Sequence, residues 1–184
     1  MGRQNTQTKE PRTAKQIPKG HVQQQHPVGG RHTIHWQAIL RLAEITSEQL
    51  PAILAAATHL DIKKILQDEE KTLKKHVVKL KRFVEHQNDL SDPSANDTVR
   101  SFQQALTDIL RANQGGWVQD QQLISWLIHV CRAQVGHYQA LLSEPSCAVP
   151  PDARDLLNQG LTEKADLERS LVVIRGRSAQ RYVD

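Results

Sequence analysis

Apolar residues recur every three or four positions along most of the chain after residue 33, which is the spacing of an amphipathic α-helix. Alternating apolar and polar runs, the sign of a half-buried strand, do not accumulate there. The pattern predicts four long helices, over residues 33–59, 61–86, 119–142 and 152–174. A shorter helix is expected from Ser94 or Asn96 to the Gly115–Gly116 pair. Helices of this length with modest loops favour an all-α antiparallel bundle.

Two residues affect how these helices should begin and bend. Pro51 lies inside the first helix, where it removes one backbone hydrogen bond, so we expect a kink or a break near Leu50. Asp61 is a suitable N-cap for the second helix. Each helix has an apolar stripe that we expect to face the core, and a few polar residues lie on these stripes. They are Glu69, His76, Cys131, Gln134 and Lys164.

The composition indicates the cellular compartment in which the protein is expected. Only two cysteines occur, Cys131 and Cys147, and they form neither a CxxC motif nor a disulfide framework. A reducing compartment is therefore the expected one, and we assign the protein to the cytoplasm. No stretch reaches the roughly 18 apolar residues that a membrane span requires, so no membrane is expected among its partners.

Residues 1–32 differ from the rest of the chain in charge and composition. They hold six basic residues against one acidic residue, whereas the remainder is close to neutral. This segment is rich in Gln and Pro and poor in apolar residues, so we expect a disordered basic tail followed by one domain over 33–184. A transit peptide is the alternative interpretation. Within the tail the candidate contacts to nucleic acid are Arg3, Arg12, Lys15 and Lys19.

The 119–142 segment also carries a likeness to a known family. The residues that fall at the matching spacing are Asp120, Leu123, Ile124, Val130, Tyr138 and Leu141. In these positions the segment resembles the third bundle helix of the YciE/YciF-like ferritin-like family. Shorter matches, at Ala43–Glu44 and from Leu156 to Leu171, resemble the first and last helices of that family. The resemblance covers about residues 36–175 and implies a ferritin-like antiparallel four-helix bundle with an additional short helix.

The positions at which the family keeps its metal-binding carboxylates read differently in this chain. They are Thr72, Cys131, Gln134 and Lys164. A di-metal bundle site needs about four carboxylates and two histidines, commonly as Glu-x-x-His pairs, and this chain contains no Glu-x-x-His. The resemblance therefore implies a degenerate member that lacks most metal ligands, and no cofactor is expected.

A few residues remain that have the right chemistry for a metal site. The candidates are Glu44, Glu69, His76 and Glu163. The simpler interpretation is a histidine hydrogen-bonded to a neighbouring helix and a carboxylate paired with a lysine. For Lys164 two interpretations stay open: its ammonium replaces a metal's charge beside Glu44 or Glu69, or its long stem reaches solvent. Cys131 is expected to be a buried, inert thiol.

The predicted bundle, its basic tail and its altered core positions indicate three alternative functions. The first is a non-enzymatic bundle that acts as a homo-oligomer or as a scaffold for a protein partner, with a stress-related role as one option. The second is a nucleic-acid-associated protein that uses the basic tail and the lysine-rich outer face of the second helix. The third is a metal-binding ferritin-like stress protein with a rearranged centre. No catalytic residues are assigned.

Overall fold

In the computed structural model, the backbone is described for residues 29–85, 93–112, 115–143 and 149–180, and the side chains for 33–85, 97–112, 115–143 and 149–177. This part of the chain forms five α-helices and contains no strand, which confirms the all-α prediction. The helices are α1 (Gly29–Ala56), α2 (Leu60–Glu85), α3 (Pro93–Ala112), α4 (Gly116–Ser143) and α5 (Pro151–Gln180).

Three details at the helix ends differ from the sequence expectation. Helix α1 begins at Gly29, inside the segment assigned to the tail, and residues 1–28 lie outside the described part of the chain. It also continues through Pro51 to Ala56 without a break. Pro51 is solvent exposed, and it removes one backbone donor from α1 without ending the helix. The N-cap of α2 is His59, whose Nδ1 accepts a hydrogen bond from the backbone N–H of Asp61 at 3.2 Å.

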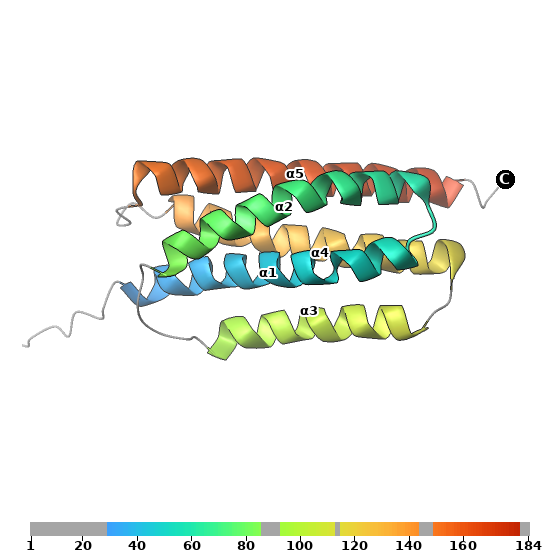
Figure 1. The fold of residues 1–184 in the computed structure, drawn as a ribbon, viewed down its shortest axis with the longest axis horizontal. Coiled ribbons are helices and arrows are strands. Elements are labelled where there is room, and N and C mark those ends of the chain that lie inside the picture. Colours follow the sequence, from blue (N-terminus) through green and yellow to red (C-terminus); the bar gives the residue numbers. More distant parts are fainter. Residues whose placement is uncertain (1–28, 86–92, 113–114, 144–148, 181–184) are drawn as a thin grey trace, which may run out of the picture.

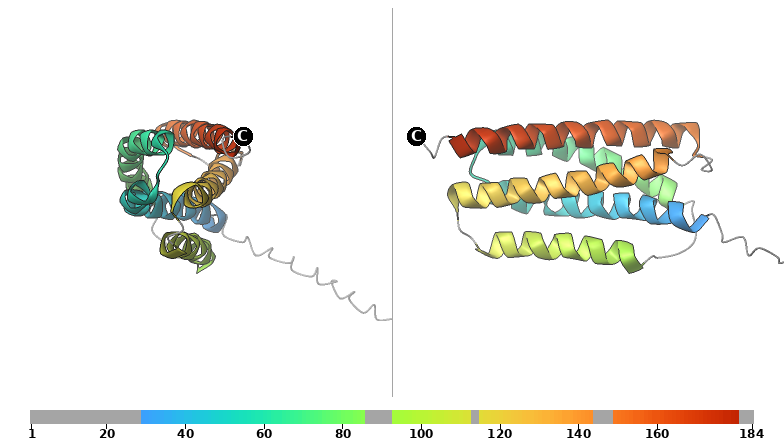
Figure 2. Two further views of the ribbon diagram at one scale, coloured as in Figure 1. Left: turned by 90° about the vertical axis from the view of Figure 1, so that its right-hand side faces the viewer. Right: turned by 180° about the vertical axis from the view of Figure 1, so that it is seen from behind.

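Helices α1, α2, α4 and α5 occupy the four corners of the molecule when it is viewed along its long axis (Figure 2). Helix α1 packs against α2 and α4, and α5 packs against the same two helices from the opposite side. Helix α3 lies outside this group, against α1 and α4 (Figure 1). Helix α3 carries the chain from the end of α2 back along most of the bundle to the start of α4 (Figure 1). Helices α2 and α4, which lie at diagonal corners, therefore run in the same direction.

The apolar core is divided into two clusters. One contains Leu50 and Ile53 of α1 together with Leu66, Leu123 and apolar residues of α3 and α5. The other lies toward the opposite end of the bundle and contains Trp36, Ile39, Leu73, Leu80, Tyr138 and Leu157. Along α2, α4 and α5 the residues between the two clusters are Glu69, Gln134 and Lys164, and all three are buried. A polar layer therefore crosses the middle of the core.

Candidate functional site

The polar layer is centred on an ion pair between α2 and α5. Glu69 is 9% exposed and Lys164 is 3% exposed, and the Lys164 ammonium donates to the Glu69 carboxylate. Both residues lie on the apolar stripe of their own helix, so the packing of the two stripes brings them together. Moving two charges out of water costs free energy, and the attraction between the ammonium and the carboxylate offsets part of that cost. Lys164 thus stays inside the core and does not reach solvent.

A second buried contact lies two helical turns along α2, toward its C-terminal end. The Nε2 atom of His76 is 2.6 Å from the hydroxyl of Tyr138 on α4. Burial, assisted by the positive charges of Lys164 and Lys79, lowers the pKa of His76 from 6.5 to about 4. Burial also raises the pKa of Tyr138, with Glu163 and Glu69 adding to the effect. A neutral His76 ring and a protonated Tyr138 hydroxyl therefore share this hydrogen bond.

Gly160 of α5 makes room for this contact. A Cβ atom at position 160 would lie 2.6 Å from Cζ of Tyr138 and 2.8 Å from Cε1 of His76. Both neighbours are ring atoms in a packed core and have little freedom to move away. The absence of a side chain at Gly160 is thus what allows α5 to pass so close to the His76–Tyr138 pair.

The remaining member of the polar layer is Gln134 on α4, and Cys131 lies one turn before it, in the first apolar cluster. Cys131 is buried, and burial raises the pKa of its thiol to about 12. The thiol is therefore protonated and a poor nucleophile, as the sequence suggested. Gln134 is 1% exposed, and its Nε2 has no hydrogen-bond partner among the described residues.

Two of the proposed metal ligands lie away from the Glu69–Lys164 pair. Glu44 accepts from Arg41 at 3.0 Å and from Lys81 at 2.9 Å near the surface. Of the two carboxylates considered as partners of Lys164, Glu69 is therefore the one in contact with it. Glu163 accepts a hydrogen bond from the amide of Gln159, one turn earlier on α5, at 2.7 Å. It shares a cavity of about 200 Å³ between α2 and α5 with Thr72 and His76.

The donor set of the polar layer does not fit a di-metal centre. Within the described residues, no three His, Cys, Asp or Glu side chains lie close enough together to hold a metal ion. The Glu69 carboxylate is already engaged by an ammonium, and Nε2 of His76 is engaged by the Tyr138 hydroxyl. His137 is engaged elsewhere, because its Nδ1 lies 2.9 Å from Nδ1 of His35. The buried polar residues of these helices therefore form contacts with one another, and the charge of Glu69 is neutralised by Lys164.

Sequence reasoning did not find the role of Asp120, which is buried near the start of α4. Its carboxylate accepts from the backbone N–H groups of Thr58 and His59 at 2.8 and 2.9 Å, and from the Thr58 hydroxyl at 2.5 Å. The contact joins α4 to the turn between α1 and α2. Nothing local in the sequence marks it, since the partners are about sixty residues away.

The proposed nucleic-acid contacts in the tail, Arg3, Arg12, Lys15 and Lys19, lie outside the described residues. No helix in the described part of the chain has a stretch long and apolar enough to cross a lipid bilayer. No family model, no curated protein and no solved structure matches this chain.

Proposed function

We propose that this protein is a non-enzymatic, ferritin-like helical bundle that acts as an oligomerisation scaffold. The observation that carries the proposal is the buried pair between Lys164 and Glu69. In a metal-dependent bundle the interior carboxylates are held for the metal ions. In this chain the interior carboxylate of α2 is neutralised by a lysine of α5. The centre is then part of the folded core, which leaves function to the surface.

The order of the helices supports the ferritin-like part of the proposal. Ferritin-like bundles have one long crossover connection between their second and third core helices. Helix α3 lies on the outside of the bundle between α2 and α4 in the chain, and it returns the chain along the bundle (Figure 1). It is therefore suited to the role of that crossover.

The exposed apolar residues support the scaffold part. Four large apolar side chains lie toward the end of the bundle that carries the α1–α2 turn, and we call them the turn-end patch. They are Leu60, Val118, Val172 and Val173. Leu60 is 79% exposed and Val173 is 49% exposed. They come from three helices that meet at this end of the bundle. Exposed apolar side chains favour association, and we expect the partner to be a second copy of the chain.

Sedimentation velocity tests this proposal over a range of concentrations. We expect the full chain to sediment as a dimer or larger, and the double variant Leu60→Glu/Val173→Glu to sediment as a monomer. Val78→Glu is the matched control, since Val78 is 53% exposed but lies in the other half of α2. A wild-type chain that remains monomeric at every concentration would refute oligomerisation. Elemental analysis showing about two tightly held metal ions per chain would refute the non-metal centre.

A second candidate function is nucleic-acid binding through α2. Its outer face carries exposed lysines that make no ion pair with the described residues, whereas Lys74 and Lys81 are paired with Glu70 and Glu44. The unpaired ones are Lys64, Lys71, Lys75 and Lys79. Such a row can contact phosphates without reading sequence. Retention on DNA that falls steeply with salt, and that weakens in Lys71→Gln/Lys75→Gln, is the expected result; retention unchanged by salt would exclude this function.

A further inference from the structure

A groove lies between the first half of α2 and the second half of α5, and we call it the α2–α5 groove. Its volume is about 480 Å³. The apolar part of its lining comes from Ile65 of α2 and from Val173 and Ile174 of α5. Val173 also belongs to the turn-end patch. The exposed apolar surface of that patch therefore continues into the groove.

The two walls of the α2–α5 groove carry opposite charges. The wall on α2 has the exposed residues Asp61 and Asp68, with Lys64 between them, and the wall on α5 has the exposed residues Arg169 and Arg177. Acidic residues are in the majority on the first wall, and the second wall is basic. Among the described residues, no ion pair crosses from one wall of this groove to the other.

Two of these charged residues have a contact within their own part of the chain. Arg169 donates to Asp166 of α5, and the carboxylate of Asp61 lies 4.0 Å from Nδ1 of His59. Both contacts involve exposed side chains, so they contribute little to stability. A guanidinium has five N–H donors and a carboxylate has two acceptor oxygens, so each group can still bind a second partner.

The charges are also matched in their spacing along the two walls. Helices α2 and α5 run in opposite directions, so Asp61 and Arg177 lie toward the α1–α2 turn, and Asp68 and Arg169 lie toward the middle of the bundle (Figure 1). At a rise of about 1.5 Å per residue, the two acids are about 10 Å apart along α2 and the two arginines about 12 Å apart along α5. An α2 wall laid over an α5 wall in this direction can therefore form both pairs at once.

A second copy of the chain provides such a wall if the two copies are related by a two-fold axis along the groove. This axis places α2 of each copy over α5 of the other without shifting it along the bundle. Asp61 then faces Arg177 of the other copy, and Asp68 faces Arg169 of the other copy. A two-fold axis across the groove would instead place α2 over α2 and α5 over α5, with like charges opposed.

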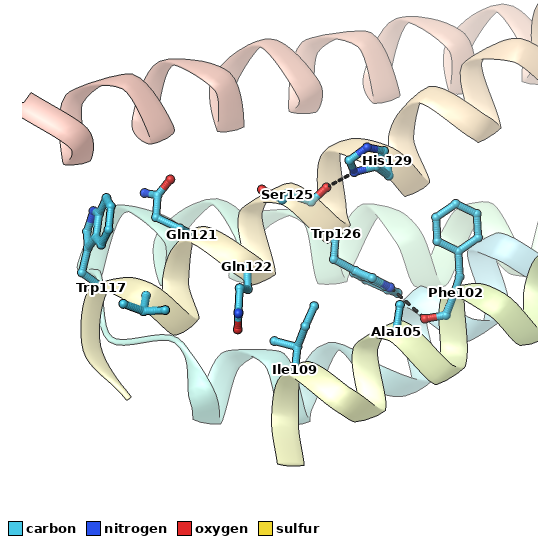
Figure 3. Close-up of a pocket in the computed structure, with 10 residues that line it drawn as sticks. Phe102, Ala105, Ile109, Trp117, Gln121, Gln122, Ser125, Trp126 and His129 are labelled. Carbon is cyan, nitrogen blue, oxygen red and sulfur yellow. Dashed lines mark hydrogen bonds between the residues drawn. The ribbon is translucent and has the colours of Figure 1, made fainter. Parts of the chain in front are cut away.

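The groove between α3 and α4 offers no comparable indication of a partner. Phe102, Trp117 and Trp126 contribute to its lining, and the indole N–H of Trp126 donates to the backbone carbonyl of Phe102 at 2.8 Å (Figure 3). No Lys, Arg, Asp or Glu lines it, so it lacks the charges that would select and orient a partner. The α2–α5 groove combines apolar surface with such charges.

We propose that two copies of the chain pair through the α2–α5 groove, about a two-fold axis that runs along it. This inference rests on the proposed oligomerisation and specifies its face and its symmetry. Each copy supplies both an acidic and a basic wall, so the surface is complementary to itself, as a two-fold interface requires. Pairs between arginine and carboxylate fix the register, and the apolar residues between the walls lose contact with water.

Charge reversal followed by sedimentation velocity tests this proposal. The variants Asp61→Lys/Asp68→Lys and Arg169→Glu/Arg177→Glu each oppose like charges, so each alone should raise the dissociation constant of the dimer about a hundredfold or more. An equimolar mixture of the two variants should form a dimer again, because every wall then faces the opposite charge. All of these side chains are exposed, so each variant should keep the helical circular dichroism and cooperative melt of the wild-type chain.

The matched control is Asp97→Lys/Asp108→Lys, which makes the same change of charge at exposed positions of α3 and should dimerise as the wild-type chain does. Groove variants that dimerise normally, or a mixture that stays monomeric, would overturn the α2–α5 interface and leave the proposed oligomerisation standing. A wild-type chain that is monomeric at every concentration would overturn both and assign the groove to a different occupant.

The wild-type chain provides a second measurement that needs no variant. Raising the ionic strength to about 1 M shortens the Debye length to about 3 Å and screens exposed charges. The dissociation constant of the wild-type dimer should therefore rise with salt. A dimer that is equally tight or tighter at high salt would contradict an interface whose register is set by these ion pairs.

Discussion

The side chain of Lys164 lies inside the core and donates to the carboxylate of Glu69, which faces it from α2. Both positions fall between the two apolar clusters, so the pair sits where the core would otherwise be continuous. A buried ion pair is weak evidence for net stability, but breaking one by removing a single partner leaves an uncompensated charge. Removing one partner should therefore cost more free energy than replacing both, and the two cases can be compared by measurement.

Lys164→Met should lower the free energy of unfolding by about 3–5 kcal/mol, because it leaves the Glu69 carboxylate buried and unpaired. Adding Glu69→Leu should recover much of the loss, since two apolar residues of similar size then replace the pair. Lys81→Met is the matched control: Lys81 pairs with Glu44 near the surface, and its loss should cost under about 1 kcal/mol. Chemical denaturation of the four proteins decides, and equal losses for Lys164→Met and Lys81→Met would contradict the prediction.

Gly160→Ala should destabilise the bundle by about 1–3 kcal/mol, because the added methyl group overlaps the rings of Tyr138 and His76. Gly136→Ala provides the comparison on α4. No atom lies within 4 Å of a Cβ built at Gly136, so alanine there should stabilise the helix by about 0.5–1 kcal/mol. Opposite shifts of the denaturation midpoint in the two variants are the expected outcome.

The lowered pKa of His76 predicts a loss of stability in weak acid. The unfolded chain binds a proton at this histidine near pH 6.5, whereas the folded chain does so only near pH 4. The contribution of His76 is therefore complete above pH 6.5 and is lost as the pH falls toward 4, by about 3 kcal/mol in total. His76→Gln should flatten the dependence of unfolding free energy on pH across this window.

His129→Gln serves as the control for that experiment. His129 is exposed and its ring Nδ1 donates to the carbonyl of Ser125. The variant leaves the buried His76–Tyr138 contact in place, so the slope that His76 contributes between pH 4 and 6.5 should remain. The half-buried His137, whose pKa is also lowered by burial, keeps part of the slope in every variant. A His76→Gln protein with an unchanged slope would show that this histidine is not the group that titrates.

Asp120→Ala should lower the free energy of unfolding by about 2–3 kcal/mol, since it removes the acceptor for two backbone N–H groups of the α1–α2 turn. Hydrogen exchange should rise first at Thr58 and His59 if the contact holds this turn in place. Asp68→Ala is an exposed control on α2, for which a change within about 0.5 kcal/mol is expected. Unchanged protection of the turn in Asp120→Ala would contradict the role assigned to the carboxylate.

Local pattern was enough to place the helices and most of their buried faces. Glu69, His76, Gln134 and Lys164 all lie inside the core as their spacing indicated, because the period of an α-helix is set by its own backbone. Two other positions on the apolar stripes, Gln49 of α1 and Val135 of α4, are only partly buried. They lie on the stripe but at its edge, where burial depends on how closely the neighbouring helix approaches.

The partners of those residues were decided by the tertiary structure. Whether Lys164 balances Glu44 or Glu69 depends on which helix faces α5, and α5 packs on α2 while Glu44 lies on α1. The contact of Asp120 with the α1–α2 turn and the groove under α3 likewise join residues that are far apart in the chain. Periodicity along one helix determines which side of it turns inward, but it contains no information on the relative placement of two helices, and that placement is what creates the ion pair, the turn contact and the groove.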